Sequence, residues 1–176
     1  PVLNVYAKMC ALIGAPGAGQ LTKMVNQVAI VGLLQGLSEA LNFGKKAGLD
    51  MEKVIAVISK GAAQSWQMDN RALTMIDDKF DFGFATRWMY KDLGIALAEA
   101  KKCGALMPAT ALVNQFYAQL LAVGGDRWDS SCLIRNLTRA AQAAKAKAAK
   151  KARKKPAKSK AGKKRKARKG RRRARR

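Results

Sequence analysis

The segment from Gly14 to Gly48 constrains the fold more than any other part of the sequence. Glycines and Pro16 come first, and apolar residues then recur at helical spacing: Leu21, Met24, Val25, Val28, Ala29, Val31, Leu33, Leu34 and Leu37. Because these residues cover more than one helical face, the sequence predicts one long, largely buried helix on which the other elements pack. Pro16 marks its start, and Gly44 or Gly48 supplies its stop.

Three polar residues lie on one side of this predicted helix, namely Lys23, Asn26 and Gln27. Unpaired polar groups are costly in apolar surroundings, so we expect them to face a cleft. In the alternative interpretation, Lys23 simply extends to solvent near the helix start. A phosphate-binding P-loop is excluded because Gln20 follows the last glycine, and a dinucleotide fingerprint is excluded because Thr22 stands at its third glycine position.

The remaining chain up to about residue 137 predicts further helices and one short strand. The pattern favours a helix end at residues 1–9, a strand at 10–13, and helices at 50–58, 64–76, 86–102, 112–123 and 129–137. Asp50, Thr86 and Asp129 or Ser130 are predicted as helix caps, and Pro108 as a first-turn residue.

Hydrophobic side chains in the middle of the chain predict a core. We expect Trp66, Leu73 and Ile76 to point inward from their helix, and Met89, Leu93, Leu97 and Ala100 to form a buried stripe. A group of aromatic residues is interpreted mainly as core rather than as a cofactor platform: Phe80, Phe82, Phe84, Trp88 and Tyr90.

Positive charge is concentrated at the C-terminal end. The net charge is +24, yet residues 1–144 hold 15 basic residues against all 11 acidic ones, and residues 145–176 hold the other 20 basic residues and no acid. This terminal composition predicts disorder when free and contact with a polyanion such as DNA or RNA. The densest clusters are Lys163, Lys164, Arg165, Lys166, Arg171, Arg172 and Arg173. The alternatives are attraction to an anionic membrane, a solvated tail without a partner, and an extension from outside the natural reading frame.

Residue types narrow the remaining chemistry. Three cysteines lie far apart, so we expect reduced thiols and a cytoplasmic protein. The sequence contains no histidine, which removes the commonest metal ligand, and no metal site is predicted. No uninterrupted apolar run of membrane-spanning length and no signal peptide pattern is evident, so no membrane span is expected.

Several short motifs together resemble a known family. They are Gly17-Ala-Gly19 with Lys23 and Asn26-Gln27, Glu39-Ala-Leu, Ala47-Gly-Leu-Asp50, Ser65-Trp66, Phe80-Asp-Phe-Gly-Phe84, Lys91-Asp-Leu93, Met107-Pro108 and Gly125-Asp-Arg-Trp-Asp129-Ser. Over residues 10–137 the chain resembles the C-terminal helical domain of the beta-hydroxyacid dehydrogenases, such as 3-hydroxyisobutyrate dehydrogenase and tartronate semialdehyde reductase.

The resemblance implies an architecture. It implies an all-α domain like the C-terminal domain of 6-phosphogluconate dehydrogenase, built on one long helix. Residues 1–13 would be the remnant of a preceding Rossmann domain, 14–138 the helical domain, and 139–176 a disordered basic tail. The printed residues contain no G-x-G-x-x-G turn, so we expect them to be inactive without a cofactor-binding domain.

The resemblance also implies roles for individual residues. Lys23 would be the catalytic acid–base group, Asn26 and Gln27 would contact substrate, and Lys91 would point at the cofactor or the substrate carboxylate. Gln27 stands where relatives often carry a second Asn. The cofactor would be NAD or NADP, the substrate a small 3-hydroxy acid or its semialdehyde, and the assembly a homo-oligomer formed through the helical domain. The alternative is a non-catalytic helical scaffold whose tail binds nucleic acid.

Overall fold

The computed structural model describes residues 2–139, and every element within that range is helical. The helices are α1 (Leu3–Tyr6), α2 (Ala18–Lys46), α3 (Met51–Ile58), α4 (Trp66–Ile76), α5 (Thr86–Cys103), α6 (Pro108–Leu121) and the 3₁₀ helix η1 (Ser130–Leu133), which continues into a helix at 134–139. The described part contains an isolated bridge between Ala85 and Asp129 but no strand. The predicted all-α class is confirmed, and the strand predicted at residues 10–13 is wrong.

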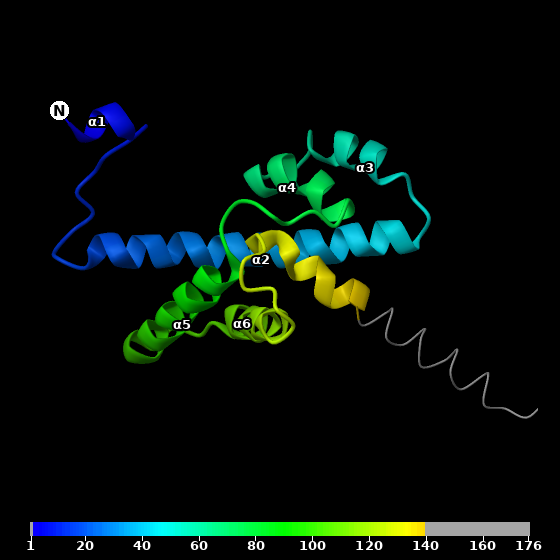
Figure 1. Cartoon of the computed structure of the whole chain (residues 1–176). Helices are drawn as coiled ribbons and strands as arrows, with labels where there is room; N and C mark the ends of the chain where they lie inside the picture. The colour runs from blue at the N-terminus through cyan, green and yellow to red at the C-terminus, as the bar shows by residue number, and fades with distance from the viewer. Residues whose placement is uncertain (1, 140–176) are drawn as a thin grey trace, which may run out of the picture. The chain divides into compact units, whose positions relative to one another are not determined.

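Helix α2 is the element around which the others pack. It contacts α3, α4, α5, α6 and η1, and Figure 1 shows α3 and α4 on one side of it and α5 and α6 on the other. Val31, Leu34 and Leu41 of α2 are at most 1% exposed and join a core that includes Phe80, Leu93, Tyr117 and Leu133. The prediction that the chain folds on one long helix is therefore confirmed.

The buried face of α2 is narrower than its sequence suggests. Its buried apolar residues form one stripe, whereas Leu21, Val25 and Leu33 are about half exposed or more. The expectation of a largely buried helix is wrong, because the packed helices cover only part of its circumference. By length and composition α2 could also cross a bilayer, but a core helix passes the same test, and α2 packs as one here.

Helix ends follow from a few residues with specific backbone geometry. Gly48 adopts φ +79° just after α2, while Gly44 remains inside the helix against Met51. The Asp50 side chain accepts a hydrogen bond from Lys53 N and caps α3, as predicted. Gly104, at φ +76°, ends α5, and Pro108 occupies the first turn of α6.

Two predicted orientations are wrong. In α4 the buried face consists of Met68, Ala72 and Met75, and Trp66 and Leu73 are more than half exposed. The helix is rotated so that its methionines, rather than its larger apolar residues, meet α2 and α3. The cap of α4 is the Ser65 side chain, which accepts a hydrogen bond from Met68 N.

The start of α5 and its aromatic neighbours also differ from expectation. Thr86 is the first residue of α5 rather than its cap, because its hydroxyl donates to Trp128 O at 2.9 Å. Among the five aromatic residues predicted as core, only Phe80 is buried. Phe82, Phe84, Trp88 and Tyr90 remain more than a third exposed. Phe82 and Phe84 lie in the segment before α5, whereas Trp88 and Tyr90 lie on α5 itself, outside its buried face.

Candidate functional site

The carboxylate of Asp92 brings together side chains from two helices. Lys23 and Gln27 of α2 reach it from one side, with Lys23 Nζ at 3.3 Å from Oδ2 and Gln27 Nε2 donating to Oδ2 at 2.9 Å. Lys91 of α5 places its Nζ 3.0 Å from Oδ1. Asn26 donates from Nδ2 to Gln27 Oε1 at 3.2 Å. All four predicted site residues of the helical domain therefore lie in one cluster, which we call the Asp92 cluster.

Charge in the Asp92 cluster is set by a buried carboxylate beneath two exposed ammonium groups. The Asp92 side chain is 1% exposed, whereas those of Lys23 and Lys91 are 55% and 52% exposed. Burial raises the pKa of Asp92, but hydrogen bonds from Lys91, Gln27 and Lys23 outweigh burial and hold this pKa below its usual value of 3.8. Asp92 is therefore ionised at neutral pH and pairs with two cations.

The arrangement fixes where the lysine ammonium groups lie. A flexible lysine ordinarily samples many positions, and the buried Asp92 carboxylate restricts both tips to the same small region. The exposed tips can receive a negatively charged group from solvent. The Lys23 tip is accessible to solvent and is also tied to a fixed partner, Asp92. The cleft expected around Lys23 stays a prediction.

Asp92 is the member of the cluster that sequence reasoning missed as a functional residue. Of the pair Lys91-Asp92, the resemblance gives a role to Lys91 alone. The available signal was the register of α5, in which Met89, Asp92, Leu93 and Ala96 are all buried. A carboxylate at a core position requires partners, and the cations of the cluster supply them.

A pocket of about 470 Å³ lies beside α5 rather than at the Asp92 cluster. Phe82, Phe84 and Trp88 line it, and none of the four predicted site residues does. Lys91 Nζ lies 5.7 Å from the centroid of the Trp88 ring, so the pocket and the cluster are neighbours on α5. The tail residues predicted to bind nucleic acid, from Lys163 to Arg173, lie outside the described residues.

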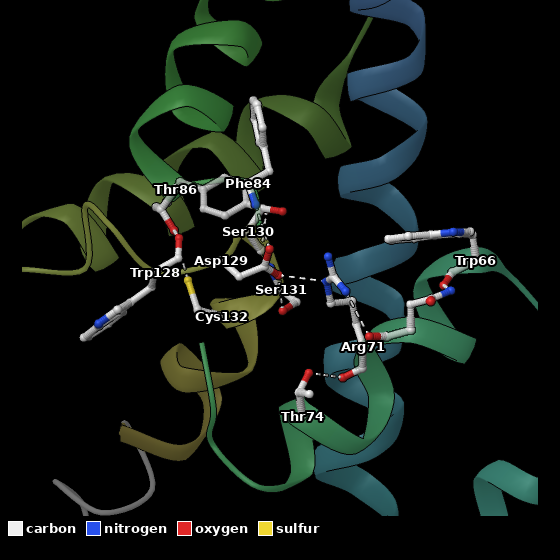
Figure 2. A network of polar contacts seen from close by, with 12 residues as sticks. Trp66, Arg71, Thr74, Phe84, Thr86, Trp128, Asp129, Ser130, Ser131 and Cys132 are labelled. Carbon is white, nitrogen blue, oxygen red and sulfur yellow. Dashed lines mark hydrogen bonds and ion pairs between the residues drawn. The ribbon is translucent and has the colours of Figure 1, made fainter. Parts of the chain in front are cut away.

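A second polar network joins α4 to the segment before α5 and to the segment after α6 (Figure 2). Arg71 Nε lies 3.3 Å from Asp129 Oδ1, and Asp129 Oδ2 accepts a hydrogen bond from Phe84 N at 3.0 Å. The Arg71 guanidinium also lies over the Trp66 and Phe82 rings, at 4.9 and 5.0 Å from their centroids. This network holds the Phe82–Phe84 loop in place and so shapes the neighbouring pocket.

Cysteine chemistry does not enter either network as a reactive group. Cys132 is fully buried beside Thr86, with Sγ 3.2 Å from the hydroxyl, and burial raises the pKa of this thiol to about 11. It therefore stays protonated at neutral pH. Cys10 and Cys103 are exposed and free, and the described residues contain no group of ligands suited to a metal ion.

Replacing Gly83 with alanine is expected to destabilise the domain. Gly83 has φ +71°, and an added Cβ would collide with the Asp129 carboxylate, so the variant suffers backbone strain and disturbs the pair with Arg71. The expected loss is about 2 to 4 kcal/mol, measured by urea unfolding. Gly94→Ala is the matched control, because open space surrounds Gly94 within α5 and alanine there should stabilise by about 0.5 to 1 kcal/mol. Equal urea midpoints for Gly83→Ala and Gly94→Ala would contradict the close approach of Gly83 to the Asp129 carboxylate.

Comparison with known proteins identifies the fold and the family. Residues 17–137 match a family model described as "NAD-binding of NADP-dependent 3-hydroxyisobutyrate dehydrogenase". An uncharacterized oxidoreductase of Shewanella frigidimarina is 57% identical over 140 residues, covering 80% of this chain and 48% of the relative. The 2-hydroxy-3-oxopropionate reductase of Escherichia coli is 33% identical over 137 residues, covering 78% of this chain and 47% of that protein.

Solved structures agree with this match. The 3-hydroxyisobutyrate dehydrogenase of Mycobacterium tuberculosis, solved with L-serine, superposes with a TM-score of 0.69 at 28% identity, covering 78% of this chain and 49% of that one. The chain thus spans about half the length of the relatives it matches. From the matched residues and the shared helical fold, the chain belongs to the 3-hydroxyisobutyrate dehydrogenase family and contains its C-terminal helical domain.

Proposed function

We propose that this domain forms the substrate side of an NAD(P)-dependent enzyme that interconverts a small 3-hydroxy acid and its semialdehyde. The observation that carries the proposal is the Asp92 cluster, in which Lys23 is presented to solvent on a buried carboxylate within a domain of this family. The relatives' names support the substrate class, because they include a 3-hydroxyisobutyrate dehydrogenase and a 2-hydroxy-3-oxopropionate reductase.

The chemistry assigned to Lys23 is proton transfer. The nicotinamide supplies or accepts the hydride. When a carbonyl is reduced, negative charge develops on its oxygen, and the Lys23 ammonium stabilises that charge and donates a proton to the oxygen. The ionised Asp92 carboxylate holds the ammonium in position between turnovers. The proton transfer assigned to Lys23 is the same with NAD and with NADP, so either cofactor fits the proposal.

The neighbours of Lys23 take different parts in the proposal. Lys91 presents a second positive charge suited to a cofactor phosphate or to the substrate carboxylate. Asn26 is exposed and can orient the substrate, as the resemblance implies. Gln27 is buried, and both ends of its amide are engaged, one by Asp92 and the other by Asn26. These contacts favour a positioning role for Gln27 over direct contact with substrate.

Assembly and location complete this proposal. Large apolar side chains remain exposed along α2, including Leu21, Val25, Leu33 and Phe43, and their exposure favours burial against another copy in a homo-oligomer. Reduced cysteines favour a cytoplasmic enzyme. Neither property depends on the identity of the substrate.

The test is an assay of the complete reading frame that contains these residues. The expressed protein is incubated with NADH or NADPH and a panel of small semialdehydes, and then with NAD or NADP and the matching 3-hydroxy acids. Saturable turnover of at least one pair is expected. If a folded protein that binds the cofactor turns over none of them, the proposed substrate class is wrong.

A second candidate function is supported by the charge of the C-terminal residues. Twenty basic residues without a single acid suit a polyanion, so we also propose that residues 145–176 bind DNA or RNA without reading sequence. In this alternative the helical domain is a scaffold that carries the tail. The two functions separate experimentally, because only the first depends on Lys23 and only the second on the tail.

A further inference from the structure

We propose that a nucleic acid bound by the C-terminal tail also contacts the helical domain, at a surface formed by Trp128, Arg135 and Arg139. We call these three residues the Trp128 surface. The inference rests on the second candidate function proposed above, and it adds a phosphate contact within the described residues. The Trp128 surface shares no residue with the Asp92 cluster or with the lining of the pocket beside α5.

The Trp128 surface is built on the last described helix. Arg135 and Arg139 lie about one turn apart on the helix at 134–139, so their side chains leave the same face. Both guanidinium groups lie over the Trp128 ring, with Cζ 4.1 Å and 5.1 Å from the ring centroid. The partly buried ring therefore holds two cations near one point of the domain surface.

Arg139 differs from the other arginines that lie over tryptophan rings. Three of these pair with a carboxylate: Arg71 with Asp129 at 3.3 Å, Arg87 with Asp126 at 3.9 Å, and Arg135 with Asp78 at 2.7 Å. Arg139 is exposed and forms no ion pair among residues 2–139. No acidic residue follows Asp129 in the sequence, so the later residues offer no carboxylate side chain either. The positive charge of Arg139 is therefore uncompensated.

The setting of Arg139 suits a phosphate group. The Trp128 ring lies against a face of the guanidinium, so its N–H donors remain along the edge. Two oxygens of one phosphate can accept parallel hydrogen bonds from that edge. Asp78, which is 65% exposed, is the acid that contacts the Trp128 surface, and Arg135 offsets its charge through two hydrogen bonds to the carboxylate.

Sequence continuity keeps the tail's nucleic acid close to the Trp128 surface. Lys145 is the first basic residue of the tail, and residues 140–144 between it and Arg139 carry no charged side chain. Six residues span at most about 22 Å even when fully extended. This length corresponds to roughly six base pairs of a duplex. A duplex bound at Lys145 is therefore within a few base pairs of Arg139, and the uncompensated charge attracts its backbone.

The test measures how binding of the full chain to a short DNA duplex depends on salt, by fluorescence anisotropy. Arg139→Gln should reduce the slope of log affinity against log salt by about 0.9, the contribution of one phosphate contact. Asp78→Asn should strengthen binding, because it removes a negative charge and asparagine tolerates the left-handed backbone at φ +57°. In NMR spectra, saturating duplex should shift the Trp128 indole N–H, assigned by its loss in Trp128→Phe, more than that of Trp66.

Lys101→Gln is the matched control, since it removes one exposed positive charge from the last turn of α5. Trp128 O accepts a hydrogen bond from Thr86 at the other end of α5, about 20 Å along the helix axis from Lys101. The slope for Lys101→Gln should therefore equal that of the wild type.

The outcomes separate this inference from the function of the tail. If the wild type binds the duplex but Arg139→Gln leaves the slope unchanged, or Lys101→Gln lowers it equally, the inference is overturned and the tail function stands. A slope change that appears with anionic vesicles and not with DNA also overturns it. If the wild type binds no duplex, the tail function and this inference are both wrong.

Discussion

Replacing Lys23 with alanine in the intact enzyme is expected to lower kcat by roughly 10²- to 10⁴-fold. Under the proposed mechanism, the variant removes the ammonium that stabilises and protonates the developing alkoxide, and no other residue of the Asp92 cluster lies in its position. Lys91 contacts the opposite oxygen of Asp92, so its Nζ is held away from the Lys23 position. The measurement is steady-state kinetics with the best substrate from the panel.

The control for this variant is Lys46→Ala, which removes a positive charge from the far end of the same helix. Its kcat should match the wild type, and both variants should keep the wild-type helix content by circular dichroism. Because Lys23 is half exposed, its removal should not unfold the domain. A Lys23→Ala variant that retains more than about a third of the wild-type kcat would exclude the catalytic role.

The C-terminal tail should bind DNA and RNA with a steep dependence on salt. Residues 145–176 contain 20 basic residues but no aromatic to stack on a base and no Asn or Gln to read a base edge. The binding free energy must therefore come from phosphate contacts and counterion release. If about six to ten phosphates are engaged, affinity should fall roughly 10³- to 10⁵-fold between about 50 and 200 mM salt, equally for unrelated sequences.

Deleting residues 145–176 is the matching control. Binding should disappear, while the helical domain keeps its unfolding midpoint, because the core described here lies entirely before that deletion. Duplex DNA, RNA and anionic vesicles are compared over one salt series. Binding that ignores salt, that persists after the deletion, or that appears only with vesicles would contradict a nucleic-acid tail.

Features governed by local backbone chemistry could be predicted from the sequence. The Asp50 cap, Pro108 in the first turn of α6 and the stop at Gly48 depend on neighbouring residues alone, and the structure confirms all three. The long central helix followed from its apolar spacing. These sequence signals can be interpreted without knowing which helices pack against one another.

Features that depend on packing partners could not be predicted in the same way. Trp66 faces solvent because Arg71 lies over its ring and because the methionines of α4 fill the core instead. The burial of α2 was overestimated, since the spacing of its apolar residues does not reveal how many helices pack against it. Asp92 was missed as the centre of its cluster because its partners on α2 are more than sixty residues away in sequence.

The most direct test of the proposed site is a double-mutant cycle between Lys23 and Asp92, measured as kcat in the intact enzyme. If Asp92 acts by positioning Lys23, Asp92→Asn should lower kcat by roughly ten-fold when Lys23 is present and by less than about two-fold when Lys23 is already alanine. A loss by the same factor in both backgrounds would contradict the proposal, because Asp92 would then act independently of the lysine it holds.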